Sequence, residues 1–431
     1  MPKYLSISLS IAIFLIFAYT LFTNTLNLPS FDDYDTTLGF IKRIFFDDYT
    51  LLGKLEILFS RHNEHRIIFS KSAAAAYYSI FHQVDFANLV FFQNLFLIGF
   101  FVLMLFVMKQ NSMLYGENLL IAAVFLFSLA FWQVTFFYWG GIQHYTVFFF
   151  CFLSLFLLNK SQQIKSWIFF FSILSVAAAV FSFGNGFLAL LLGAFMLFVQ
   201  KKRALLVVWS LLSAVLLWIT FIPRPEVAGG GHTPFNFDWA ARLLFTFMGS
   251  FLYINPSTNQ YINIYICMAV GAAVLITWIW LFFKGYAYQN PLLYCLLSLP
   301  ILTGVIISIS RFETRAGGGI APRYMFFTAT IPVILLLIFL DLKVLKQRHL
   351  RVLAVFGLLL WGTVFYNNRK ALIVMNQDLE TRVAKWEKDP NTRLIYYHEA
   401  KGYSDVMQWA VDKKVVKLGI LKESKLNDDF L

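Results

Sequence analysis

Charged residues and cysteines are scarce in this sequence, and their scarcity is the first guide to its class. Only 13% of the residues are charged, whereas 59% are hydrophobic, and the mean hydropathy is +0.68. A water-soluble core of 431 residues does not require so much apolar sequence. All three cysteines, Cys151, Cys267 and Cys295, lie inside apolar stretches, which excludes an extracytoplasmic disulfide framework and a thiolate metal cluster. The composition therefore predicts a chain that resides in a bilayer.

Long apolar stretches recur along nearly the whole chain. A spanning helix needs about 20 predominantly apolar residues, and on this criterion the sequence predicts an all-α polytopic membrane protein with about eleven transmembrane helices. The first stretch has no small-residue cleavage site after it, so we expect a retained helix. The predicted spans are 5–23, 88–108, 118–138, 142–158, 167–183, 187–199, 205–222, 262–283, 292–309, 325–340 and 350–366.

Lysine and arginine orient these spans. If the N-terminus is cytoplasmic, most basic residues near the span ends fall on the cytoplasmic side, as the positive-inside rule requires. The same distribution explains most of the net charge of +12, so the charge gives no support for a nucleic-acid partner. We expect a multi-pass protein of the cytoplasmic (inner) membrane with its C-terminus in the periplasm. The basic residues placed in the cytoplasm are Lys3, Lys109, Lys160, Lys165, Lys201, Lys202, Arg203, Lys284, Lys343, Lys346, Arg348 and Arg351.

Three segments outside the spans are long enough to carry structure, and all are predicted to be extracytoplasmic. Residues 24–86 form the first extracytoplasmic loop, where the apolar spacing at 36–46 and 51–59 predicts two amphipathic surface helices. Residues 223–261 form the second loop, and residues 367–431 form a small C-terminal region that we expect to dock on the outer face. Residues 1–366 then constitute the transmembrane domain.

One pair of predicted spans is unusually short. Residues 166–200 contain no Lys or Arg, and they must cross twice to keep Lys165 and Lys201 on the same side. That stretch is hardly long enough for two full spans of about 20 residues each. We therefore expect its turn, residues 182–186 with Asn185, to be recessed below the outer surface and to form the floor of a cavity.

Three carboxylates within four residues follow the first span: Asp32, Asp33 and Asp35. Like charges at such spacing raise at least one pKa or attract a cation, and either outcome suits a general base or a metal ligand. The alternative is a structural one, because an Asp at a helix start accepts backbone N–H bonds as an N-cap. The local pattern leaves both interpretations open.

A second polar group precedes the helix predicted over 67–81. Its two histidines do not have the His-Glu-x-x-His spacing that places two imidazoles on one helix face, which disfavours a zinc site. Anion binding by Arg61 and Arg66, with Glu64 or His65 as a polar partner, fits the composition better. The group consists of Arg61, His62, Asn63, Glu64, His65 and Arg66.

Further ionisable residues lie at later span ends. We expect a tight turn at Gly140 and Gly141 to place His144 at the top of the next span, as a functional group or as a neutral packing histidine. The loop over 311–324 contains three arginines on the side where basic residues are rare, which indicates an anionic partner or a lipid headgroup. These arginines are Arg311, Arg315 and Arg323, and Arg323 enters the next span with Tyr324.

Together these residues resemble the GT-C superfamily of membrane glycosyltransferases, in particular bacterial enzymes that use polyprenyl-phosphate sugars. The resemblance rests on Asp32-Asp33-Tyr34 after the first span, two surface helices in the first loop, Asn63-Glu64-His65-Arg66, and Pro322-Arg323-Tyr324 opening a late span. It covers most of residues 1–366 as architecture, through short motifs. The C-terminal region is small, whereas several members of the superfamily carry large outer domains, so acceptor recognition does not transfer.

The resemblance implies a reaction and a set of roles. A sugar would pass from polyprenyl phosphate to a glycan, lipid or protein acceptor with inversion, and Asp32 or Asp33 would be the general base. Membrane lipids would surround the site, and a divalent cation (Mg or Mn) stays open because the superfamily has no single rule about metals. The residues implied in donor-phosphate binding are Arg323, Tyr324, Arg315 and His144. Those implied in positioning the donor or acceptor are Asp35, Arg61, Asn63, Glu64, His65, Arg66 and Asn185.

Two other functions compete with this one. A lipid-linked glycan polymerase or ligase would also place arginines and histidine at the outer leaflet, but it predicts a large loop between late spans. Here the largest loop between spans is the first. A transporter or flippase predicts charges at mid-membrane, and the interiors of the predicted spans contain almost none.

Overall fold

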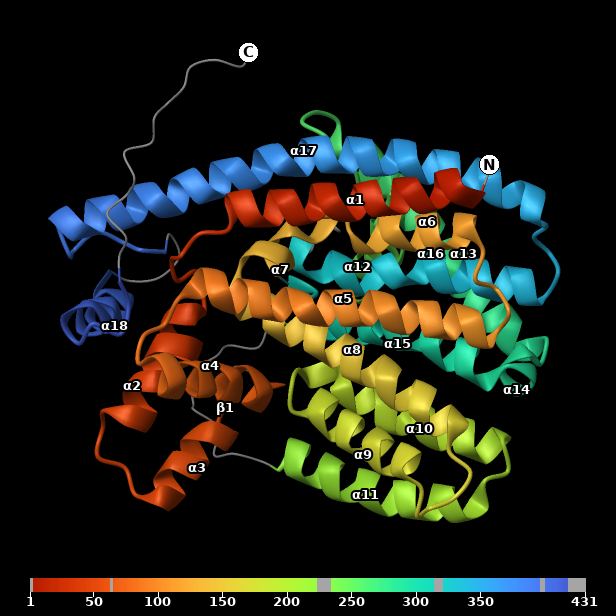
Figure 1. The fold of residues 1–431 in the computed structure, drawn as a ribbon, viewed down its shortest axis with the longest axis horizontal. Helices are drawn as coiled ribbons and strands as arrows, with labels where there is room; N and C mark the ends of the chain where they lie inside the picture. Colours follow the sequence, from red (N-terminus) through yellow and green to blue (C-terminus); the bar gives the residue numbers. More distant parts are fainter. Residues whose placement is uncertain (1–2, 63–64, 223–233, 314–320, 396–399, 418–431) are drawn as a thin grey trace.

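The computed structural model describes residues 3–62, 65–222, 234–313, 321–395 and 400–417. Over these residues the chain is a bundle of long helices with a single two-stranded hairpin (Figure 1). Nine helical segments of the described chain are long and apolar enough to cross a membrane, in agreement with an all-α polytopic protein. These segments are α1 (Lys3–Asn24), α5 (Phe86–Gln110), α6 with α7 (Gly116–Leu126 and Trp132–Phe136), α8 (Tyr138–Lys160), α11 (Arg203–Phe221), α13 (Gln260–Phe283), α15 (Pro291–Ser310), η6 with α16 (Pro322–Tyr324 and Met325–Asp341) and α17 (Gln347–Lys388).

The predicted short hairpin is present. It consists of α9 (Trp167–Val180) and α10 (Leu188–Val199), joined through the 3-10 turn η3 (Gly184–Phe187). At a rise of about 1.5 Å per residue, the 14 residues of α9 reach only about 21 Å, against a hydrocarbon thickness of about 30 Å. The η3 turn therefore lies below the level that the full-length helices reach.

The span predicted over 118–138 is present, but its helix is interrupted. Helix α6 ends at Leu126, and the chain restarts as η2 (Leu129–Phe131) and α7. Ser128 caps the new start through its Oγ, which accepts from the Ala130 N–H at 3.1 Å. The freed carbonyl of Phe127 accepts a hydrogen bond from Trp361 Nε1 at 2.9 Å, so the interruption leaves this group satisfied inside the bundle.

Two further helix boundaries differ from the prediction. Gly140 and Gly141 do not form a tight turn before the next span, because α8 already begins at Tyr138 and both glycines belong to its first turn. Helix α17 does not end near residue 366 but runs on to Lys388, so the domain boundary drawn there falls within a helix. Residues 363–389 contain neither Gly nor Pro, and nothing in the sequence stops the helix there.

The first loop folds into short helices, as predicted. It contains a π-helical turn η1 (Tyr34–Gly39), α2 (Phe40–Phe45), α3 (Leu51–Phe59), the strands β1 (Arg61–His62) and β2 (His65–Arg66), and α4 (Ile68–Phe81). Helix α3 buries none of its residues, and Leu51, Leu52 and Leu55 are exposed, which suits a helix at a bilayer surface. We call the end of the bundle that carries this loop the outer end, after the orientation that the basic residues predict.

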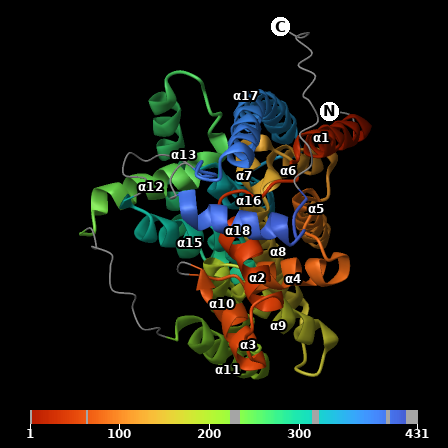
Figure 2. The ribbon, with the colours of Figure 1, turned by 90° about the vertical axis from the view of Figure 1, so that its left-hand side faces the viewer.

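The C-terminal region docks on the same end. Helix α18 (Ala400–Asp412) packs against η1, and Figure 2 shows it lying across the bundle beside α2. Met407 and Ala410 are fully buried in a second hydrophobic core, separate from the transmembrane core, that joins the first loop, α17 and α18. Beyond α18, Val84 N–H donates to the Val415 carbonyl at 2.7 Å. Residues 400–417 therefore dock on the end of the bundle that carries the first loop, as expected.

The second loop is also held closely where the structure describes it. Helix α12 (Phe237–Gly249) and the turn η4 (Ser250–Leu252) pack against α13, α15 and α16, and α14 (Tyr286–Gln289) lies at the other end of α13. Gly249 allows α12 to approach α13, because a Cβ at this position would lie 1.9 Å from the Cys267 carbonyl oxygen. Ser250 Oγ and Thr328 Oγ1, 2.6 Å apart, hold the turn to α16.

The orientation can be tested by cysteine labelling, since all three natural cysteines are buried. Asp48, in the first loop, and Lys165, between α8 and α9, are both exposed. We expect Asp48→Cys to react with a membrane-impermeant maleimide in cells whose outer membrane has been opened. Lys165→Cys should react only after the inner membrane is permeabilised. The reverse pattern would invert the topology and place the first loop in the cytoplasm.

Candidate functional site

The small hairpin of β1 and β2 is the structural centre of the outer end. Its strands pair antiparallel, with Arg61 opposite Arg66 and His62 opposite His65. Arg61 Nη2 donates to the carbonyls of Thr220 at 2.7 Å and Ile222 at 3.1 Å, which fixes β1 to the end of α11.

Two other cations bind the end of α3: Arg66 connects it to the hairpin, and Lys71 connects it to α4. Arg66 donates to the Phe59 carbonyl at the end of α3. Lys71 of α4 is 3% exposed, and its Nζ donates to the carbonyls of Ile57 at 3.1 Å and Ser60 at 2.9 Å. A helix C-terminus leaves carbonyl groups without intrahelical partners, and these cations satisfy them. The hairpin is thus fixed from both sides.

On one side of the hairpin, His62 lies between two carboxylates. Its Nε2 is 3.3 Å from Asp32 Oδ2, and its Nδ1 is 3.3 Å from Asp35 Oδ2. Arg43 Nη2 donates to Asp35 Oδ1 at 3.4 Å. Burial alone would lower the pKa of His62, but the two carboxylates outweigh it and raise the pKa to about 9. The imidazolium in turn lowers the pKa of Asp35, so the cluster is an ion-paired network at neutral pH.

Asp33 has a different environment from Asp32 and Asp35. It is fully buried, and Oδ2 accepts from the backbone N–H and the hydroxyl of Ser30, both at 3.1 Å, while Oδ1 accepts from Thr37 Oγ1 at 3.2 Å. Burial raises its pKa to about 8, and the hydrogen bonds from Ser30 and Thr37 offset only part of that effect. The N-cap alternative is not observed for Asp33, because its side chain accepts no N–H of η1, and the backbone N–H that it accepts belongs to Ser30, before the turn.

Helix α18 contributes to the same surroundings. The ring of Tyr403 stacks on Tyr34 with centroids 5.1 Å apart. Burial first, and then the charges of Asp32 and Asp35, raise the pKa of Tyr403 to about 12, which places its hydroxyl in the field of the acidic pair. The C-terminal region therefore belongs to the wall of the acidic cluster.

On its other side the hairpin faces a cavity of about 280 Å³. Cationic side chains from the first and the last interspan loops meet there: Arg61 and Arg66 from the hairpin, and Arg311 from the end of α15. The η3 turn closes the cavity from below, as the length of residues 166–200 predicts. The polar residues that line it are Arg61, His65, Arg66, Asn185, Thr220, Thr303, Ser310, Arg311 and Tyr324.

The floor and the hairpin are in close contact. The His65 ring packs on Phe183 with centroids 4.3 Å apart. A Cβ on Gly184 would lie 2.2 Å from His65 Nδ1, so glycine is required for the hairpin to approach the turn. The next residue, Asn185, donates from Nδ2 to Thr303 Oγ1 of α15 at 2.9 Å. The turn is thereby fixed to both the first loop and α15.

Arg323 and His144 stand beside the lining residues. The Arg323 guanidinium lies 4.9 Å from the centroid of Tyr324 and 5.9 Å from that of Trp139. His144 is 2% exposed, and its ring centroid lies 4.9 Å from that of Phe183 and 6.0 Å from that of Tyr324. The structure thus brings Arg61, His65, Arg66, Asn185 and Tyr324 to the cavity itself, while Arg323 and His144 contact its walls.

Three of the sequence-predicted site residues, Asn63, Glu64 and Arg315, lie outside the described residues. Two further residues of the site, His62 and Arg311, have no individual role among the sequence-based predictions. Both belong to polar groups that the sequence does show, the run from Arg61 to Arg66 and the loop after α15. The position of His62 inside that run indicates a functional residue. Its contacts with Asp32 and Asp35 depend on the fold and could not be predicted from the sequence.

A divalent cation would need several oxygen or nitrogen ligands at one point. In the described part of the chain no group of three or more His, Cys, Asp or Glu side chains is arranged to hold a metal ion. In the acidic cluster, the position between Asp32 and Asp35 is taken by the His62 ring.

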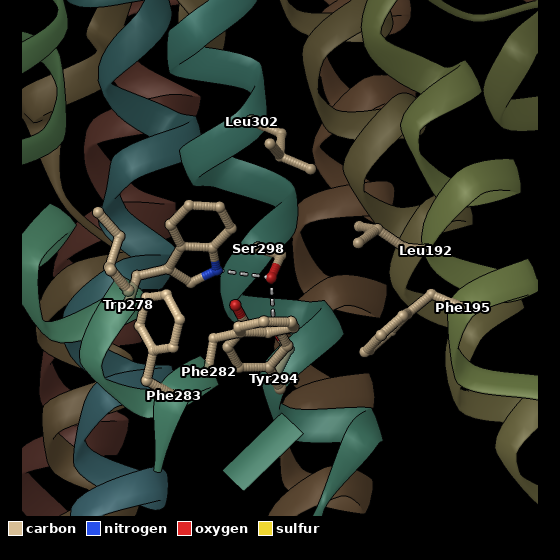
Figure 3. A pocket seen from close by; sticks show the side chains of 9 residues that line it. Leu192, Phe195, Trp278, Phe282, Phe283, Tyr294, Ser298 and Leu302 are labelled. Carbon is tan, nitrogen blue, oxygen red and sulfur yellow. Dashed lines mark hydrogen bonds between the residues drawn. The ribbon is translucent and has the colours of Figure 1, made fainter. Parts of the chain in front are cut away.

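A larger cavity, of about 360 Å³, lies between α10, α13 and α15 and is apolar (Figure 3). Trp278 Nε1 donates to Ser298 Oγ at 2.8 Å, and the Trp278 ring stacks on Tyr294 with centroids 6.1 Å apart. The described residues that line it include no charged side chain, so they offer no cation to a phosphate and no carboxylate as a base.

Comparison with known proteins adds no assignment: no family model, no curated protein and no solved structure matches this chain. The site must therefore be interpreted from its own chemistry.

The charge on His62 predicts a pH-dependent stability. Its pKa of about 9 in the folded protein exceeds the ordinary value of 6.5, so its stabilising contribution is complete below pH 6.5 and is lost as the pH rises through 9. Allowing for solvent screening, we expect that contribution to be on the order of 1–2 kcal/mol. The difference in thermal unfolding midpoint between the wild type and His62→Gln should be larger at pH 6 than at pH 9.5. An equal difference at both pH values would mean that His62 is uncharged.

Proposed function

We propose that this protein is a membrane glycosyltransferase of the GT-C type, which transfers a sugar from a polyprenyl-phosphate donor to an acceptor outside the cytoplasm. The single observation that supports this most is the meeting of two kinds of group at one hairpin. An acidic pair lies against His62, and the neighbouring residue Arg61 lines a cavity with arginines from two loops. A lipid phosphate and a hydroxyl acceptor need these two kinds of group side by side.

The arginines account for the donor. Guanidinium groups bind phosphate through paired, charge-assisted hydrogen bonds, and a cavity bounded by Arg61, Arg66 and Arg311 offers them to one anion. In the proposed reaction the bond between the anomeric carbon and the phosphate oxygen breaks, and polyprenyl phosphate leaves with the bonding electrons. Positive charge around the leaving oxygen stabilises the negative charge that develops there.

The acidic pair accounts for the acceptor. A hydroxyl oxygen attacks the anomeric carbon from the face opposite the phosphate, its proton passes to a carboxylate, and the configuration inverts. Asp32 is the proposed base, because its side chain is 26% exposed and borders His62 at the site, whereas Asp33 is fully buried among Ser30 and Thr37. Asp35 then holds His62 in place and positions the acceptor.

The choice between the two carboxylates can be tested directly. We expect Asp32→Asn to lower transfer by about 10²- to 10⁴-fold, the usual contribution of a general base. Asp33→Asn should keep most of the activity, since an amide can still accept from the Ser30 N–H and donate to Thr37. The measurement is the amount of glycan product, by mass spectrometry of the cell envelope, in cells that carry each variant.

Asp48→Asn, an exposed carboxylate of the same loop, serves as the matched control and should retain full activity. Full activity in a correctly inserted Asp32→Asn variant would refute Asp32 as the base. An unchanged glycan profile upon deletion of the protein, together with altered flux of a small solute, would favour the transporter.

A second test concerns donor binding. Arg311→Gln removes one cationic group from the cavity, and we expect the KM for the polyprenyl-phosphate donor to rise by about 10- to 100-fold, as for loss of a hydrogen bond to a charged group. Arg348→Gln, an exposed arginine in the first turn of α17 at the other end of the bundle, is the control. A KM that Arg311→Gln leaves unchanged would place the phosphate elsewhere.

A further inference from the structure

Asn185, which lines the cavity, carries a buried acceptor atom that phosphate binding does not use. Asn185 is 4% exposed, and its Nδ2 is occupied by Thr303. Its Oδ1 is buried and has no hydrogen-bond partner among the residues that the structure describes. A buried carbonyl oxygen without a donor is unfavourable, and a molecule bound in the cavity that Asn185 lines can supply the donor.

The phosphate itself cannot be that donor. An ionised phosphate diester offers only acceptor oxygens, which suit Arg61, Arg66 and Arg311 but not a carbonyl oxygen. The cavity of about 280 Å³ has room for several water-sized groups, since one water occupies about 30 Å³ of the liquid. A phosphate group therefore fills only part of it. The group that the phosphate carries would occupy the remaining space, and an O–H or N–H on that group would supply the missing donor.

We propose that Asn185 accepts a hydrogen bond from a hydroxyl of the group esterified to the phosphate, so that the cavity selects a sugar-loaded carrier over the bare carrier. This inference rests on the proposed function, because it assumes that the arginines bind the carrier phosphate. Thr303 acts as a positioning residue, since its Oγ1 accepts from Asn185 Nδ2 and thereby holds the amide in place.

The selection has a consequence for turnover. Once the sugar has been transferred, the bare carrier keeps its contacts with the arginines but can no longer donate to Asn185 Oδ1. The product therefore binds less tightly than the donor through this one contact. Exchange of spent carrier for loaded carrier is favoured without any movement of the arginines.

The test measures binding to the full-length protein in lipid nanodiscs by native mass spectrometry. The probes are bare undecaprenyl phosphate and undecaprenyl phosphates that carry glucose, galactose, mannose or arabinose. We expect the wild type to prefer at least one loaded lipid over the bare lipid by about 2- to 10-fold, the value of one neutral hydrogen bond. Asn185→Ala should abolish this preference and leave the affinity for the bare lipid unchanged.

Asn159→Ala is the matched control, because this asparagine lies at the C-terminal end of α8 and its Oδ1 already accepts from Gln200. The Asn159→Ala variant should prefer the loaded lipid as strongly as the wild type does. Thr303→Val should weaken the preference in part. Deoxy versions of the preferred sugar can be tested on the wild type, so this experiment does not depend on the folding of a variant. Removal of one particular hydroxyl should abolish the preference for the loaded lipid.

Two results would overturn the inference alone: equal binding of bare and loaded lipids by the wild type, or a preference that survives in Asn185→Ala. Failure of the proposed function looks different, because the wild type would then bind neither bare nor loaded lipid, or Arg311→Gln would bind both as well as the wild type does.

Discussion

The depth of the η3 turn is the constraint on which the outer end depends. The 14 residues of α9 reach only about 21 Å, less than the roughly 30 Å of the hydrocarbon core, so a span built on α9 brings the turn to a lower level than a full-length span would. Irregular backbone at such depth must be covered by protein or face an aqueous cavity. Here it does both, since His65 packs on Phe183 from above and the cavity opens beside Asn185. The short hairpin thus creates the space that the charged loops surround.

The hairpin of β1 and β2 separates the positive and negative side chains at the edge of this cavity. Arginines gathered around one cavity repel one another, and carboxylates gathered nearby would neutralise them by direct pairing. The structure keeps the two sets apart, because His62 carries the positive charge that faces Asp32 and Asp35 while Arg61 lies at the cavity. A histidine whose pKa is raised to about 9 remains charged over the physiological range, so this separation does not depend on a metal ion.

The sequence predicts the transmembrane part of this arrangement well, for physical reasons. Apolar length and the position of lysines decide how often the chain crosses, and they also predict the recessed turn. The break after Leu126 could not be predicted, because the carbonyl of Phe127 at the break is satisfied by Trp361 from a helix far along the chain. The continuation of α17 beyond residue 366 could be predicted, since the stretch lacks any helix breaker. The predicted end near residue 366 follows only from the end of the apolar run.

The site was predictable in its groups but not in its pairs. The run from Arg61 to Arg66 and the acidic residues after the first span are evident as unusual polar clusters. Which carboxylate is buried is a tertiary property: Asp32 and Asp33 are adjacent and chemically identical, yet only Asp33 is enclosed by Ser30 and Thr37. Likewise, the contact between Tyr403 and Tyr34 joins segments from opposite ends of the chain.

The C-terminal region illustrates how a small segment can matter to such a site. Helix α18 buries Met407 and Ala410 against the first loop, and the same packing brings Tyr403 next to the acidic pair. The loop that carries Asp32 consists of short helices, and short isolated helices are marginal in water. Docking α18 reduces the freedom of that loop, and a catalytic carboxylate must be held within a fraction of an ångström to act as a base. The C-terminal region therefore adds rigidity to the loop that carries Asp32.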